Sequence, residues 1–122
     1  MSSCHRIAGL CATALVAACS SAPPEPSPRS LALSIQAGKI AEECFTIGAG
    51  ERIDYQFEAS TPVDFNLHTH RGKEIVTPVD IKKTRSQAGI FASPRAEDYC
   101  MMWSNESAVP VIVKGEWRML RR

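Results

Sequence analysis

The sequence lacks the features that mark most enzymes and membrane-spanning proteins. It contains no nucleophile elbow, no HExxH motif and no glycine-rich loop leading into a helix. Its longest apolar run is shorter than the ~20 residues that a membrane-spanning helix requires. We therefore expect a protein that is not an enzyme, with no catalytic residues and no cofactor.

An excess of charge of one sign is also missing. The chain has 14 lysine and arginine residues against 13 aspartate and glutamate residues. The basic residues are scattered, apart from Arg118, Arg121 and Arg122 near the C-terminus, which we interpret as a solvated end. Because binding to nucleic acid depends on a basic surface, we expect no nucleic-acid partner.

The N-terminus begins with a basic residue followed by a short apolar segment. Arg6 precedes the uncharged run IAGLCATALVAA, which ends directly before Cys19. A basic start, a short apolar stretch and small residues at the cleavage site are typical of a secretory signal. We therefore predict that residues 1–18 form a signal peptide that is removed.

The end of this segment indicates the kind of signal. Val16, Ala17, Ala18 and Cys19 resemble the lipobox of bacterial lipoproteins. The resemblance implies that Cys19 is acylated and becomes the mature N-terminus, and several acyl chains together anchor a protein firmly. Because Ser20 follows the cysteine, we expect a protein of the bacterial cell envelope, anchored in the outer membrane and facing the periplasm. The alternative is an ordinary signal peptide with a chance cysteine.

Proline and serine dominate the next segment. Residues 20–30 read SSAPPEPSPRS and hold four of the eight prolines, with almost no bulky apolar side chain. Such a segment cannot bury enough surface to offset the entropy of ordering it. We predict that residues 19–30 are a lipid-anchored linker and that residues 31–122 form one domain of about 90 residues.

Alternation of apolar and polar residues predicts strands in this domain. In residues 52–60 (RIDYQFEAS) and 63–70 (VDFNLHTH), every second side chain is apolar or small. Further β-rich runs lie at residues 31–36, 43–47, 74–81, 89–92, 99–105 and 109–120. Turn-forming residues separate the runs, and no stretch has a convincing helical period. The pattern predicts an all-β fold, an antiparallel β-sandwich or barrel of about eight short strands.

The parity of side chains along each run predicts which of them are buried. We expect Met101 to share the core side with Trp103 and Met102 to face the opposite way. Gly115 predicts a bulge in the last strand. The large residues predicted to be most buried are Phe45, Tyr55, Phe57, Phe65, Leu67, Ile90 and Trp103.

Two cysteines remain when the signal peptide and the acylated Cys19 are set aside. Cys44 and Cys100 each lie within a predicted strand, and the envelope is an oxidising compartment. A disulfide between them is expected, and in the chain-entropy model it stabilises the fold by about 4 kcal/mol. The alternative, in which they are metal ligands or redox-active thiols, lacks the support of a CxxC motif.

Several of these features together resemble the GOLD domain, a β-sandwich of eukaryotic secretory-pathway and lipid-associated proteins. They are Cys44 followed by Phe45 in an early strand, the aromatic residues of the next two strands, and Tyr99–Cys100 followed by Trp103 and Asn105. The resemblance covers about 75 residues of the predicted domain. It implies a jelly-roll-like sandwich that binds proteins or lipids, with no catalytic residues.

The histidines 68 and 70 are the remaining candidate site. They share the predicted outer face of their strand with Asp64 and Asn66, close enough for both imidazoles to hold one ion. A polar strand face in contact with solvent explains the same residues without metal. We therefore expect a binding or structural module for an envelope protein, lipid or glycan, and the alternative is a lipoprotein that handles copper or zinc through His68 and His70.

Overall fold

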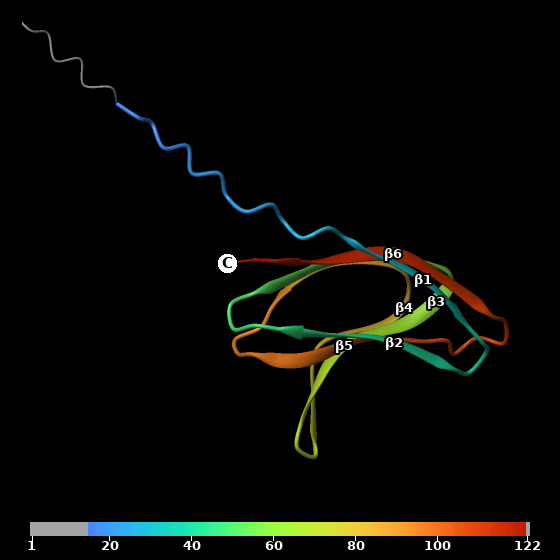
Figure 1. Cartoon of the computed structure of the whole chain (residues 1–122). Coiled ribbons are helices and arrows are strands. Elements are labelled where there is room, and N and C mark those ends of the chain that lie inside the picture. Colours follow the sequence, from blue (N-terminus) through green and yellow to red (C-terminus); the bar gives the residue numbers. More distant parts are fainter. Residues whose placement is uncertain (1–14, 122) are drawn as a thin grey trace, which may run out of the picture.

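Strands form throughout the domain, as the alternating pattern predicts. The computed structural model describes residues 15–121, so most of the predicted signal peptide lies outside the described residues. Residues 15–28 contain no helix or strand and lead away from the body of the protein (Figure 1). The strands that follow are β1 (Arg29–Ile35), β2 (Ile40–Ile47), β3 (Arg52–Arg71), β4 (Glu74–Ala92), β5 (Glu97–Ser104) and β6 (Val111–Leu120). The predicted all-β class is confirmed.

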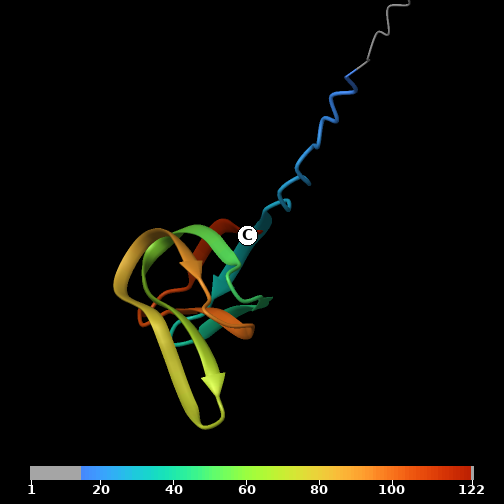
Figure 2. The ribbon, with the colours of Figure 1, turned by 90° about the vertical axis from the view of Figure 1, so that its left-hand side faces the viewer.

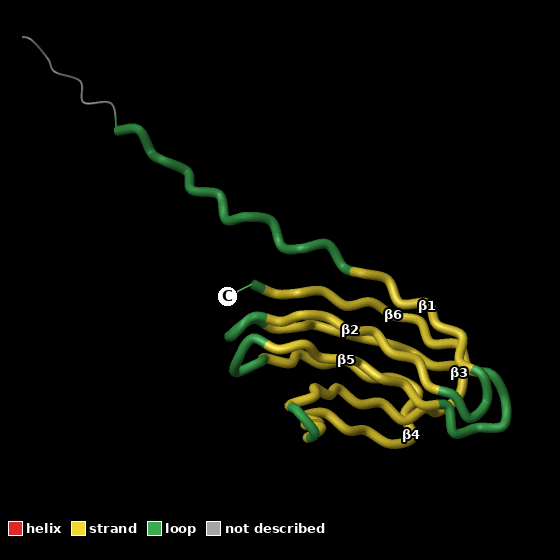
Figure 3. Tube along the Cα trace, turned by 60° about the horizontal axis from the view of Figure 1, so that its bottom comes forward, coloured by secondary structure: helices red, strands yellow, loops and turns green. Residues whose placement is uncertain are grey.

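The strands form one curled antiparallel sheet. Its order is β1-β6-β3-β5-β2, and β4 pairs with β3. The first part of β3 pairs with β6 and its later part pairs with β5, so β3 belongs to both halves of the sheet. Figures 1 and 3 show β1 and β6 in one half and β5 and β2 in the other. The apolar sides of the two halves enclose the core, which is the arrangement of a sandwich.

There are six strands in the described residues, and two of them are long. β3 contains both runs predicted at residues 52–60 and 63–70, and β4 contains those at 74–81 and 89–92. The turn residues between the runs do not end the strands, because β3 and β4 remain paired on both sides of a register shift. Figure 2 shows this hairpin curving over the body and continuing beyond it as an arm.

The core matches the predicted parity of the strands with one exception. Ile90 is 60% exposed, whereas the other six predicted core residues are buried. Ile90 lies opposite Asp54, whose side faces away from the core, and its neighbour Phe91 takes the inward position instead. The buried aromatic side chains are Phe45, Tyr55, Phe57, Phe65, Tyr99, Trp103 and Trp117.

Two predictions for single residues have different outcomes. Met101 is buried in the core, and Met102 is on the other face and half-buried, as expected. The bulge predicted at Gly115 is wrong, because its pairing with Phe57 continues in register. Glycine is required there for space: an added Cβ would lie 2.0 Å from the backbone oxygen of Gln56.

A charged cluster joins β5 to the end of β3. The Arg71 guanidinium donates to both oxygens of Glu97, over 2.6 and 3.0 Å, and the Tyr99 hydroxyl donates to the same carboxylate over 3.0 Å. The hydrogen bond from Arg71 holds the pKa of Glu97 below its ordinary value, and burial raises the pKa of Tyr99. The carboxylate is therefore charged and paired at neutral pH.

Candidate functional site

The predicted histidine pair lies on the outer face of β3, as its parity predicts. The two rings are 5.2 Å apart between centroids and stand nearly perpendicular. His70 is exposed, but only 6% of His68 is exposed. The expectation of a fully solvated polar face is therefore wrong for His68, because neighbouring side chains cover it.

The polar partners of His68 come from two strands. Its Nδ1 lies 2.7 Å from the Oδ1 of Asn66, and its Nε2 lies 3.6 Å from a carboxylate oxygen of Glu42 on β2. Asp64, which shares this face of β3, accepts a hydrogen bond from the backbone N–H of Lys83. The structure thus brings Glu42 to His68, which the sequence could not indicate without the strand order.

The predicted disulfide between Cys44 and Cys100 is confirmed and lies beside His68. Cys44 is directly opposite Cys100 on β5, and Cys100 is directly opposite His68 on β3. Cys44 is exposed and Cys100 is half-buried. Whether His68 and His70 bind a metal stays a prediction.

The other candidate region is β4, which contains no buried residue. Within the described part of the chain, β4 pairs only with β3, so the hydrogen-bonding groups of its outer edge face away from the sheet. Two parts of the strand differ in chemistry. We refer to residues 74–85 as the protected segment and to residues 86–92 as the open segment.

The protected segment carries several features that prevent strand addition. It has charged side chains and a proline, Pro78, which lacks a backbone N–H. It also contains two bulges, one with Thr77 and Pro78 opposite His68, and one with Lys82 and Lys83 opposite Asp64. Lys83 has a positive φ of 50°. Charges, prolines and bulges on an edge strand all oppose pairing with another chain.

The open segment has none of these features. Its sequence, SQAGIFA, contains no charge and no proline, and its register with β3 is continuous from Ser86 to Ala92. The exposed Ile90 lies in the middle of it. A regular, uncharged edge with an exposed apolar side chain can pair with a further strand.

A groove of about 540 Å³ lies beside the open segment. It is lined by β4, β3 and β6, where Ala88 lies opposite Gln56 and Gly115 lies opposite Phe57. Glu58 and Lys114 are directly paired residues at its wall and present opposite charges. The lining residues are Gln56, Phe57, Glu58, Ser86, Gln87, Ala88, Lys114 and Gly115.

A second hollow of about 540 Å³ lies where the linker joins the sheet, with Pro26, Arg29, Phe45 and Trp117 among its lining residues. Only 8% of Phe45 and 4% of Trp117 are exposed. The Arg29 guanidinium lies 5.2 Å from the Trp117 ring centroid, and the indole N–H donates to Glu43. The ring faces are therefore covered and offer no open platform on which a sugar ring could stack.

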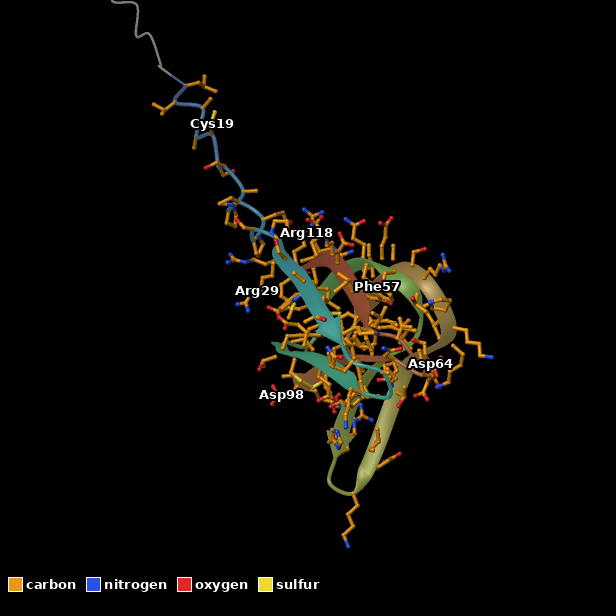
Figure 4. The ribbon with its side chains drawn as sticks, turned by 90° about the vertical axis from the view of Figure 1, so that its right-hand side faces the viewer. Cys19, Arg29, Phe57, Asp64, Asp98 and Arg118 are labelled. Atoms are coloured by element: carbon orange, nitrogen blue, oxygen red, sulfur yellow. A yellow bond between two sulfur atoms is a disulfide. The ribbon has the colours of Figure 1, made fainter. Side chains whose placement is uncertain are left out.

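The predicted acylation site lies on the extended segment that leads to the sheet. Cys19 is exposed and makes no disulfide. Figure 4 shows it away from the strands, whereas Arg29 and Arg118 lie where the segment meets the body. Within residues 15–121, no helix has the length and apolarity needed to cross a bilayer.

Three proteins of known structure have a similar fold. PliG of Aeromonas hydrophila, a periplasmic inhibitor of g-type lysozyme, gives a TM-score of 0.57 at 13% identity, covering 76% of this chain and 86% of that one. TmCBM61, solved with β-1,4-galactotriose, gives 0.56 at 10% identity, covering 76% and 70%. The Yersinia pseudotuberculosis-derived mitogen gives 0.55 at 10% identity, covering 76% and 86%.

These likenesses show the fold alone, because the identities are very low. No protein-family model matches the chain, and no curated protein matches its sequence. The three structures are those of an inhibitor, a carbohydrate-bound protein and a mitogen, as their names state. They identify no ligand for this chain.

Proposed function

We propose that this chain is a lipoprotein of the bacterial outer membrane, anchored through Cys19, whose sandwich binds an extended segment of another envelope protein. The observation that carries the proposal is the open segment of β4. Within the described residues no further strand pairs with its outer edge, its register is regular and it bears no charge. At its first residue, the Thr84 hydroxyl donates to the Ser86 carbonyl and accepts from the Ser86 N–H. A partner strand can add to such an edge through main-chain hydrogen bonds.

Features around the open segment support a protein partner. Ile90 offers an apolar contact, and the groove beside it carries Glu58 and Lys114, which can contact polar side chains of an added strand. The covered rings of Phe45 and Trp117 argue against a sugar ring stacked in the other hollow. A similar fold occurs in PliG, whose name describes a periplasmic inhibitor of g-type lysozyme. The target of that inhibitor is itself a protein.

The anchor has a direct test. In cells grown with a labelled fatty acid, the protein should carry the label, and Cys19→Ala should remove it. A segment without helix or strand, residues 20–28, separates Cys19 from β1 and leaves room for the sandwich to stand off the membrane. Label that persists in Cys19→Ala would contradict the assignment.

The binding edge is tested by photo-crosslinking in intact cells. A photoreactive amino acid in place of Ala88 should capture a defined envelope protein, whereas the same amino acid at Thr77 in the protected segment should not. Ile90→Lys should abolish capture. Ile75→Lys is the matched control, because Ile75 is also in β4 and is also 60% exposed.

Two results would count against the proposal. Equal capture from Ala88 and Thr77, or capture that Ile90→Lys and Ile75→Lys reduce equally, would contradict the open segment as the binding edge. A captured second copy of this chain would overturn the choice of partner, because the edge would then serve self-association.

A further inference from the structure

The disulfide lies in a row of side chains that crosses three strands on the outer face of the sheet. Cys44 on β2, Cys100 on β5 and His68 on β3 occupy directly opposed positions. Glu42 lies two residues before Cys44 and therefore on the same face of β2. Ligand atoms of Glu42, Cys44 and Cys100 all lie within 4.8 Å of one another.

His68 is not one of these three residues, but its ring faces Glu42. Because the Oδ1 of Asn66 can only accept a hydrogen bond, the His68 Nδ1 at 2.7 Å donates to it. In a neutral ring the lone pair is then on Nε2, which is the nitrogen 3.6 Å from the Glu42 carboxylate. A lone pair and a carboxylate that face each other repel unless a proton or a metal ion lies between them.

The hydrogen bond from His68 Nδ1 to the Asn66 side chain has the form that orients histidines at metal sites. A metal-bound histidine almost always donates its other ring N–H to an oxygen, which fixes the ring and the tautomer. The ring of His68 is also held by burial, since only 6% of the residue is exposed. Nε2 is thus positioned as a ligand atom before any ion binds.

We propose that reduction of the Cys44–Cys100 bridge converts this row into a zinc site whose ligands are Cys44, Cys100, Glu42 and His68. A dithiol reductant supplies two electrons and two protons, becomes a disulfide itself and leaves two thiols on this chain. Zn²⁺ then replaces the two thiol protons. Two thiolates, an imidazole and a carboxylate are ligands that zinc accepts in a tetrahedral site.

Access to the bridge and its surroundings favours this conversion. Cys44 is exposed, so a reductant can reach its sulfur. The four side chains are on the neighbouring strands β2, β5 and β3. The site is separate from the open segment of β4, so this inference stands independently of the proposed function.

The test uses the full chain with Cys4→Ser, Cys11→Ser and Cys19→Ser, so that Cys44 and Cys100 are the only thiols. After reduction by a phosphine, Co²⁺ is added as a spectroscopic substitute for Zn²⁺. Reduced protein should develop thiolate-to-cobalt charge-transfer bands and the strong visible bands of a tetrahedral site, and Zn²⁺ should displace the Co²⁺. The oxidised protein should develop neither.

Variants on the same face separate this site from the one predicted on the two histidines. His68→Ala and Glu42→Ala should weaken Co²⁺ binding, whereas His70→Ala should not, because His70 lies outside the ligand set. Asn66→Ala should weaken affinity by roughly 10- to 100-fold through loss of the ring's orientation. Asn66→Asp should restore most of it, because its carboxylate also accepts from Nδ1.

Three outcomes would overturn the proposal. One is a reduced, folded protein without thiolate bands. Another is equal weakening by His68→Ala and His70→Ala, or weakening by neither. The third is a reduced protein that has lost the near-ultraviolet circular dichroism of its buried tryptophans, since the ligand row needs the intact sheet.

Discussion

The two segments of β4 pair with the same strand and differ in how they treat their outer edge. The protected segment has Pro78, the bulge at Lys82 and Lys83, and alternating charges, whereas the open segment is regular and uncharged. Neither segment has a buried residue, so core packing does not explain the difference. Edge strands are normally protected against pairing, and an unprotected stretch beside a protected one indicates a place where pairing is useful.

The difference also shows how a strand can serve two purposes. The bulge at Lys82 and Lys83 lies opposite Asp64, where β3 has left β6 and begins to pair with β5, so it helps the hairpin to bend between the two halves of the sheet. The open segment lies opposite residues 52–58 of β3. Over this range β3 pairs with both β4 and β6 without a register shift. Curvature and protection therefore come from the same residues.

The largest expected loss of stability concerns Gly115 of β6, which packs against the part of β3 that pairs with the open segment. Gly115→Ala should lower the free energy of unfolding by roughly 3 kcal/mol, because its Cβ would overlap the backbone of β3 and nothing flexible can move aside. Urea unfolding measures the loss. Gly72→Ala is the control: Gly72 has a positive φ but open space around it, so only about 1 kcal/mol of backbone strain is expected. Equal losses would show that crowding at Gly115 is unimportant.

A smaller effect is expected in the protected segment. Asp64 accepts from the backbone N–H of Lys83 over 2.9 Å and lies 3.8 Å from the Lys82 ammonium. Asp64→Ala should cost about 1 kcal/mol of stability in the same urea experiment, since the contact is exposed. Asp64→Asn keeps the acceptor and should stay close to the unsubstituted protein. If Asp64→Asn loses as much stability as Asp64→Ala, the ion pair with Lys82 and not the hydrogen bond from Lys83 stabilises the bulge.

A substitution of Lys83 at the same bulge is expected to raise stability instead of lowering it. Its φ of 50° is unfavourable for a residue with a Cβ. Lys83→Gly should therefore raise the unfolding free energy by up to about 1 kcal/mol, unless the greater freedom of glycine in the unfolded chain offsets the gain. A clear loss of stability would mean that the lysine side chain contributes more than its backbone strain removes.

The smallest expected effect is on the pH dependence of stability and concerns Glu97, which pairs with Arg71 at the end of β3. The hydrogen bond from Arg71 lowers the pKa of Glu97 from its ordinary 4.5. A carboxylate with a lower pKa in the folded state contributes stability above its unfolded pKa, and this is lost as pH falls through the folded value. Glu97→Gln should therefore make unfolding stability fall less steeply below pH 4.5, as urea unfolding at several pH values measures. Glu106→Gln, which removes an exposed carboxylate, should leave the slope unchanged.

The sequence by itself determined the class of the fold and most of the core. Residues of one parity in 52–60 and 63–70 are buried because a strand places alternate side chains on opposite faces. The disulfide followed from an even pair of cysteines within strands. The sequence also placed His68 and His70 on one face of their strand, because residues two positions apart in a strand point the same way.

The tertiary structure alone decided what depends on strand neighbours. Ile90 was predicted to be buried, yet it lies opposite Asp54 on the outer face, and pairing with β3 turns the adjacent Phe91 toward the core instead. The need for Gly115 comes from the close approach of β3, and the placement of Glu42 beside His68 comes from the order β3-β5-β2. Local periodicity fixes which way a side chain points, whereas the pairing of distant segments fixes what it meets there.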